Sequence, residues 1–139
     1  MSDYGELLGR LEAATGPDRN VDFALWDQLS RPLMSLEPPH YTRSLDAAVA
    51  LTEQMLPGWA WRVATCHVSD DAWVMPDFNN PTNGEYLLSI WPEEGKVDAL
   101  GWLDSDIDQR PPGRPAIALL RSMLVGLAAL RKLEARASS

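Results

Sequence analysis

Apolar side chains recur every three or four residues over residues 44–56, which predicts an amphipathic helix. Ser44 is a suitable N-cap, and Asp46 places a negative charge at the positive end of the helix dipole. Pro57 and Gly58 forbid continuation, so the helix ends by Leu56. Its apolar stripe consists of Leu45, Ala48, Val49, Thr52, Met55 and Leu56.

The same periodicity, with a wider apolar face, predicts a long final helix over residues 115–134. Pro115 suits its first turn, because a proline there loses no hydrogen bond. We expect this helix to be the main cover of a sheet, since little polar surface remains in its first four turns. Its main stripe is Ile117, Leu120, Leu124, Leu127 and Leu130.

Two shorter helices are expected near the N-terminus. Residues 3–14 place three leucines on one face, and Gly16 with Pro17 ends the pattern. Asp18 or Asn20 caps the second helix, which closes at Arg31 and Pro32. Residues 31–40 contain three prolines and predict an irregular connection.

Alternation of large and small side chains predicts a first strand over residues 59–68, with Trp59, Trp61 and Val63 on its large face. After a turn at residues 69–71, further strands are expected at residues 73–75, 85–91 and 96–103, the last two forming a hairpin. A long loop is expected at residues 76–84, between the second and the third predicted strand. The predicted fold is one α+β domain over residues 1–139, a small antiparallel sheet of three to four strands packed with helices, like an α/β/α sandwich.

Composition narrows the class of protein. The chain has 139 residues with 45% hydrophobic residues, enough for one core without disulfides or metals. Cys66 is the lone cysteine, which excludes an internal disulfide and every multi-cysteine zinc pattern. No apolar run of membrane-spanning length and no signal segment occurs, so we expect a cytoplasmic protein without membrane contact.

Charge is distributed unevenly along the chain, which has a formal net charge of -8. Ten acids lie between Asp70 and Asp108, against Lys96 alone, whereas six bases and Glu134 lie in residues 109–139. An acidic excess repels nucleic-acid phosphates and favours basic partners, although it also serves solubility. Direct nucleic-acid binding is therefore not expected.

Three segments together resemble a known family. LLGRLEAATGPDR, PPHYTRSLDAAVAL with PGWAW, and RPAIALLRSMLVGLAAL are similar to the phage ABA sandwich domain, a family of small phage and prophage proteins. The resemblance implies helices on the faces of a small sheet and a phage or prophage origin. It implies no accepted activity and no functional residues.

A search for chemistry finds no catalytic, metal or cofactor site. Cys66 and His67 are adjacent on a predicted strand, so their side chains point to opposite faces and make a poor dyad. Asp104, Asp106 and Asp108 resemble the first ligands of a calcium loop, but Gln109 and Pro115 replace its glycine and its glutamate. A weak cation site, a solvated loop and a contact surface remain alternatives there.

The acidic segment predicts a non-enzymatic phage or prophage accessory protein that binds a host protein. If that host protein binds nucleic acid, the acidic side chains compete with the phosphates for its basic surface. The chain would then inhibit a nucleic-acid-dependent defence system. The alternatives are a binder of nucleotide signals lined by arginines such as Arg62, Arg110 or Arg114, and an uncharacterised enzyme. The predicted partner-binding residues are Asp70, Asp71, Trp73, Asp77, Phe78, Glu93, Glu94, Asp104, Asp106 and Asp108.

Overall fold

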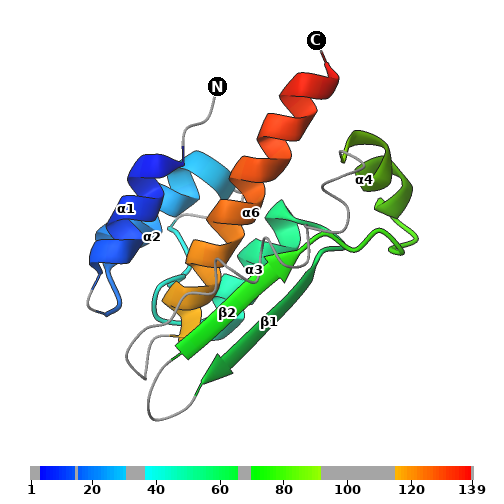
Figure 1. The fold of residues 1–139 in the computed structure, drawn as a ribbon. Helices are drawn as coiled ribbons and strands as arrows, with labels where there is room; N and C mark the ends of the chain where they lie inside the picture. The colour runs from blue at the N-terminus through cyan, green and yellow to red at the C-terminus, as the bar shows by residue number, and fades with distance from the viewer. Residues whose placement is uncertain (1–3, 15, 31–36, 66–69, 92–114, 139) are drawn as a thin grey trace.

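A β-hairpin packed on one face by helices forms the centre of the α+β fold. The computed structural model describes residues 4–14, 16–30, 37–65, 70–91 and 115–138. The long helix α6 runs over the hairpin and continues beyond it toward the C-terminus, and α3 packs beside α6 (Figure 1). The elements are α1 (Gly5–Ala13), α2 (Arg19–Leu25), the π-helical turn η1 (Trp26–Ser30), α3 (Leu45–Met55), β1 (Ala60–Thr65), β2 (Asp70–Met75), α4 (Gly84–Ile90) and α6 (Pro115–Ala137).

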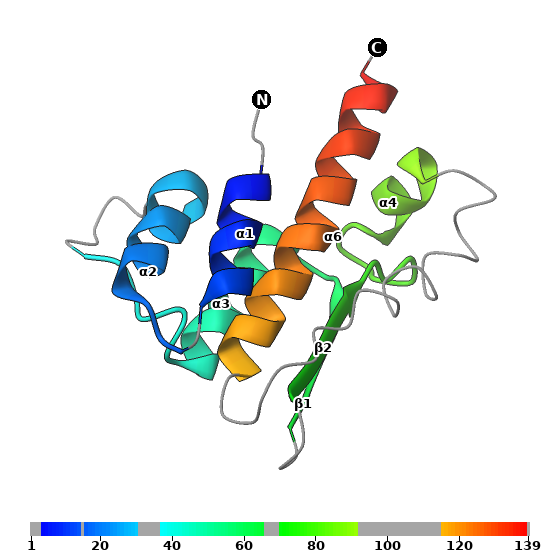
Figure 2. The same ribbon diagram turned by 60° about the vertical axis from the view of Figure 1, so that its left-hand side comes forward.

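The remaining helices are placed around α6. Helix α1 packs against both α6 and α2, and η1 contacts α3. Figure 2 shows α4 on the other side of α6 from α1, beside the C-terminal half of the long helix. Within the described ranges, no helix combines the length and apolarity that a membrane crossing requires.

Both predicted helix caps in the N-terminal half are confirmed. The Ser44 hydroxyl accepts a hydrogen bond from the Ala47 amide at 3.1 Å. The Asp18 carboxylate accepts from the Asn20 and Val21 amides at 2.9 and 3.3 Å. Each cap satisfies amides that the first helical turn leaves without a partner, and so sets where α3 and α2 begin.

The expected stripe of α6 is confirmed as the core of the protein. Ile117, Leu120, Leu124, Leu127 and Leu130 are all buried, together with Leu119 and Met123. Helix α3 differs from its predicted stripe, because Leu51 is buried while Leu45 is 37% exposed. The helix is rotated about its axis so that Ala48, Leu51 and Thr52 face inward, a choice made by packing against α6.

Helix α6 lies close against the hairpin at Gly126. A Cβ atom there would lie 2.9 Å from Val74 Cγ2 and 3.2 Å from the Trp59 ring. We expect Gly126→Ala to lower the free energy of unfolding by up to about 2 kcal/mol, since an overpacking cost of about 1–3 kcal/mol exceeds a helix-propensity gain of about 1 kcal/mol.

The matched control for this substitution is Gly9→Ala in α1, where nothing lies within 4 Å of the added atom. There only the propensity gain operates, and stability rises by about 0.5–1 kcal/mol. Urea denaturation of both variants measures the difference. Equal gains at the two positions would contradict the close approach of α6 to the hairpin.

Strand β1 has the predicted large face, which is turned inward, whereas β2 places the small Ala72 inward and the large Trp73 outward. Trp61 pairs with Val74 and Val63 with Ala72, and these four side chains point toward the helices. Arg62 pairs with Trp73 on the opposite face. The predicted turn at residues 69–71 is wrong in part, because β2 begins at Asp70. Asp70 and Asp71 continue the ladder opposite Thr65 and Ala64, and this pairing overrides their preference for turns.

Residues 85–91 form a helix, so the strand predicted there is wrong. An apolar run of this length fits either type of element, and packing decides between them. Helical spacing directs Gly84, Leu87 and Trp91 together into the interior. The centroid of the Trp91 ring then lies 6.0 Å from that of Trp59 and 5.8 Å from that of Phe78, both in edge-on geometry. The strand predicted at residues 96–103 lies outside the described residues, and the sheet of the described residues has two strands.

Candidate functional site

The face of the hairpin turned away from α6 is the leading candidate for a binding site. We call it the open hairpin face and define it by Ala60, Arg62 and Ala64 of β1 with Trp73 of β2. Arg62 and Ala64 are exposed, and Trp73 is partly exposed. No described helix packs over these residues, since α6 contacts the hairpin on the face of Trp61 and Val74. The face therefore presents an aromatic ring and a guanidinium group side by side.

Trp73 differs from the other tryptophans that the structure describes. Trp59 and Trp91 belong to the buried core, and Trp26 and Trp61 pack against it. Trp73 is in neither group, although its chain neighbours Ala72 and Val74 are each 1% exposed. The alternation of the strand places it outward, where a large ring serves recognition better than stability.

Two other predicted partner-binding residues have structural roles. The Phe78 ring packs edge-on against Trp91 and contributes to the border of the core. The Asp77 carboxylate accepts a hydrogen bond from the Asn79 amide at 3.0 Å and so shapes the turn after β2. Asp70 and Asp71 lie in β2, near Trp73 along the same strand. Glu93, Glu94, Asp104, Asp106 and Asp108, like Arg110 and Arg114, lie outside the described residues.

Sequence reasoning missed the two asparagines that close the base of the hairpin. Asn80 Nδ2 donates to the Gly58 carbonyl at 2.7 Å, and Asn83 Nδ2 donates to the Pro57 carbonyl at 2.6 Å. Gly58 has a positive φ of 81°, which a side chain at that position would disfavour. These bonds tie the loop after β2 to the turn before β1, so they fix the end of the hairpin at which Ala60 pairs with Met75.

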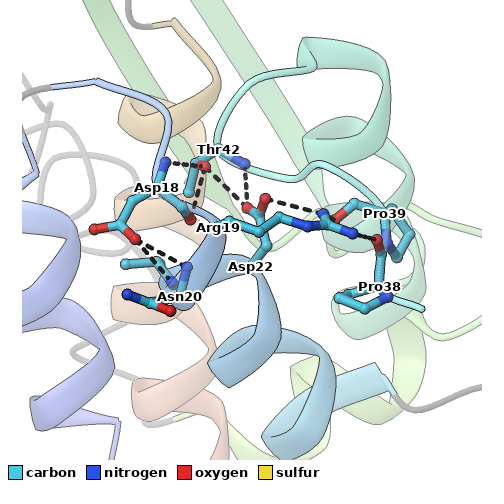
Figure 3. A network of polar contacts seen from close by, with 8 residues as sticks. Asp18, Arg19, Asn20, Asp22, Pro38, Pro39 and Thr42 are labelled. Carbon is cyan, nitrogen blue, oxygen red and sulfur yellow. Dashed lines mark hydrogen bonds and ion pairs between the residues drawn. The ribbon is translucent and has the colours of Figure 1, made fainter.

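A second cluster, shown in Figure 3, is buried and polar. Asp22, 2% exposed, accepts hydrogen bonds from the Thr42 amide at 2.8 Å and the Thr42 hydroxyl at 2.9 Å. Its other oxygen accepts from Arg19 at 3.2 Å. Arg19 also donates to the carbonyls of Pro38 and Pro39. The Arg19–Asp22 bond lies within α2, and the other four bonds join α2 to residues 38–42. The cluster is therefore a tie between two segments rather than a reactive site.

A third cluster joins α4 to α6. The Tyr86 hydroxyl donates to Glu134 at 2.9 Å, and Arg131 donates to the same carboxylate at 2.8 Å. The bond to Glu134 raises the pKa of Tyr86 above its ordinary value, because the neutral phenol is the donor. It also raises the pKa of Arg131, whose charged form is the donor. The carboxylate thus holds one side chain from each helix.

This third cluster predicts a response to alkaline pH. The raised pKa of Tyr86 means that its contribution to stability is present below about pH 10 and is lost as pH rises through the folded-state value. Replacing Glu134 by Gln removes the acceptor charge, so the pKa of Tyr86 should fall toward about 10. Phenolate absorbance during an alkaline titration measures the change. Tyr86→Phe is the control, and an unchanged titration in Glu134→Gln would mean that the bond is absent in solution.

Groups suited to catalysis or metal binding do not converge in the described part of the chain. Among those residues, no three His, Cys, Asp or Glu side chains are placed to hold a metal ion. His40 is exposed in the turn before α3, while Cys66 and His67 lie outside the described residues. No family model matches the chain, and neither a curated protein nor a solved structure proved similar to it.

Proposed function

We propose that this chain is a non-enzymatic protein-binding module whose contact surface is centred on Trp73 of the open hairpin face. The observation that carries the proposal is a partly exposed tryptophan on the outer face of the hairpin, outside the core and directly opposite Arg62. Tryptophan and arginine are the residues most enriched at the energetic centres of protein interfaces, and Arg62 lies directly opposite Trp73. The asparagine ties at the base of the hairpin limit the ordering cost of binding.

The charge of the chain supports a basic protein as the partner. Asp70 and Asp71 share β2 with Trp73, and the segment up to Asp108 is strongly acidic. Acids around an aromatic centre speed association with a basic surface and reject nucleic acid. The resemblance to phage proteins extends the proposal to a host protein as target, with inhibition of a nucleic-acid-dependent defence system as its most specific form. The three-stranded sheet, completed by residues 96–103, remains a proposal of the same kind.

The small-ligand alternative receives less support from the described residues. Arg62 is exposed on a sheet face, where water competes with a phosphate group for the hydrogen bonds of the guanidinium. Ligand sites of nucleotide size are concave and bury most of the ligand. A flat face with one tryptophan suits a protein surface better.

Capture from a lysate of the source cells tests the proposal. The immobilised protein should retain a partner at low salt and release it at high salt, since exposed charges are screened. Trp73→Ala should reduce capture roughly 30-fold or more, as expected for an interface centre worth at least about 2 kcal/mol. Phe23→Ala is the matched control, because Phe23 is 48% exposed on α2, away from the hairpin.

The acids receive a separate test. Changing Asp104, Asp106 and Asp108 to Asn should slow association with the captured partner and flatten its salt dependence, while the melting temperature stays within a few degrees. Calcium that raises the melting temperature of the original protein, but not of the triple variant, would indicate a cation site instead. Equal capture by Trp73→Ala and the original chain would refute the proposed contact surface.

A further inference from the structure

One edge of β1 pairs with no described strand, and the inner layer of the hairpin is incomplete beside it. On β2, the inward side chains Ala72 and Val74 are each 1% exposed. Their partners on β1, Val63 and Trp61, also point inward but remain partly exposed. The cause is the position of α6, which lies mainly over β2 and reaches β1 with fewer residues. An additional strand beside β1 would cover the part of Trp61 and Val63 that α6 leaves uncovered.

Strand β1 also lacks the features that normally block edge-to-edge pairing. Its six residues, AWRVAT, contain no proline and one charge, and its pairing with β2 runs without a bulge. Natural edge strands are usually protected by several charges, a proline or a bulge. Within the described residues, β1 pairs on one side only, with β2. No described strand pairs with its second edge, whose backbone amides and carbonyls have the geometry that another strand requires.

We propose that this edge binds a second copy of the chain, with the two β1 strands antiparallel about a twofold axis at Val63. Inward residues must face inward residues, which restricts the axis to a residue rather than a peptide bond. An axis at Arg62 would set two guanidinium groups directly opposite each other, which is unfavourable. An axis at Val63 sets Arg62 opposite Ala64 of the second copy and Trp61 opposite Thr65.

Counted over the described strands, the resulting assembly is a sheet in the order β2, β1, β1, β2, with helices on one face. A third strand at residues 96–103 would then lie beside β2. A two-stranded sheet is marginal by itself, and four strands with a covered face are not. The interface is isologous, so it closes at two copies and cannot extend into a fibre. The open hairpin faces of both copies become one continuous surface carrying two Trp73 side chains. The inference goes beyond the proposed function, because it uses the edge of the sheet rather than its outer face.

A charge substitution at position 64 tests the register directly. Ala64 is exposed, so a longer side chain is accommodated without disturbing the core. In the proposed dimer, the twofold axis sets position 64 of each copy opposite Arg62 of the other copy. Ala64→Glu therefore creates two opposite-charge pairs, and Ala64→Lys creates two like-charge pairs. The dimer dissociation constant, from sedimentation over a dilution series that reaches about 1 mM, should fall roughly 2- to 30-fold for Ala64→Glu and rise by a similar factor for Ala64→Lys.

Ala128→Glu and Ala128→Lys are the matched controls, because Ala128 is exposed on α6. They change the net charge of -8 by the same amount as the substitutions at position 64. Overall repulsion between the copies increases with Glu and decreases with Lys, which is the opposite of the effect expected from the local contacts at position 64. Adding salt should strengthen the dimer of the original chain, because it screens the repulsion between two copies of charge -8. Salt should weaken capture of a basic partner, so each proposal can be contradicted without the other.

Three results would overturn the dimer. The first is a monomer at every concentration, which would mean that the edge is occupied by the chain itself or by water. The second is a dimer that responds equally at positions 64 and 128, which would place the interface elsewhere. The third is a dimer that Ala64→Lys strengthens, which would exclude the register with Val63 on the axis.

Discussion

Replacing Asp22 by Ala is expected to lower the free energy of unfolding by about 1–3 kcal/mol, because the substitution removes the acceptor of buried hydrogen bonds. Its ion-pair partner Arg19 is 33% exposed, so no charge is left buried. Asp22 is 2% exposed and accepts three hydrogen bonds, two from Thr42 and one from Arg19. Without the carboxylate, the Thr42 amide is left buried with no acceptor from α2. Residues 38–42 then keep the bonds between Thr42 and the Asp18 backbone and those from Arg19 to the carbonyls of Pro38 and Pro39.

Urea denaturation of Asp22→Ala, Thr42→Val and the double variant separates the tie from general damage. Thr42→Val removes the hydroxyl and keeps the backbone amide, so it should cost less than Asp22→Ala. The two effects should not add, since both variants break the same bond. Glu53→Ala, at an exposed position of α3, should change stability by less than about 0.5 kcal/mol. A cost for Asp22→Ala similar to that of Glu53→Ala would show that the cluster in Figure 3 does not form in solution.

Replacing Leu124 by Ala should cost about 2–5 kcal/mol, through lost burial and the cavity that remains. Leu124 is 1% exposed and belongs to the stripe by which α6 covers the hairpin. Leu88→Ala is the matched control, because Leu88 is 41% exposed on α4. The control should lie within about 0.5 kcal/mol of the original protein. Similar midpoints for the two variants in urea would place Leu124 at the surface and contradict the packing of α6.

The two predictions probe different halves of the fold, which makes their comparison informative. Asp22 ties α2 to residues 38–42, and Leu124 lies in the layer between α6 and the hairpin. If unfolding is a single cooperative transition, both substitutions shift the whole curve. A variant that loses only α2 would instead broaden the transition and lower its slope against urea.

Local sequence signals were sufficient to predict an element wherever its backbone hydrogen bonds are made within the element and its apolar residues form one regular face. Ser44 and Asp18 were recognisable as caps, because a cap needs only a side-chain oxygen within three residues of the free amides. The stripe of α6 was readable for a similar reason, since a helix of that apolarity must be buried on most sides. The outward orientation of Trp73 follows from strand alternation once β2 is in place.

The same reasoning failed at residues 85–91, where the apolar run fits a strand and a helix equally well. Contacts from distant parts of the chain decided the outcome: Trp91 meets Trp59 and Phe78, and Tyr86 meets Glu134. Such partners are 48 residues apart for Tyr86 and Glu134, and no local pattern encodes their meeting. Asp70 and Asp71 illustrate the same limit, because cross-strand pairing outweighed their turn preference.

The sequence by itself determined the α+β class, the places of the helices other than α4, and the buried stripe of α6, because these depend on periodicity and capping over a few neighbouring residues. Tertiary structure alone decided which candidate side chains remain available at the surface. It directed Phe78 onto Trp91, engaged Asp77 in a turn and left Trp73 on the face that α6 does not cover. The reason is physical: burial is a property of pairs of elements, and which face of a hairpin a helix covers is settled only when the two pack together.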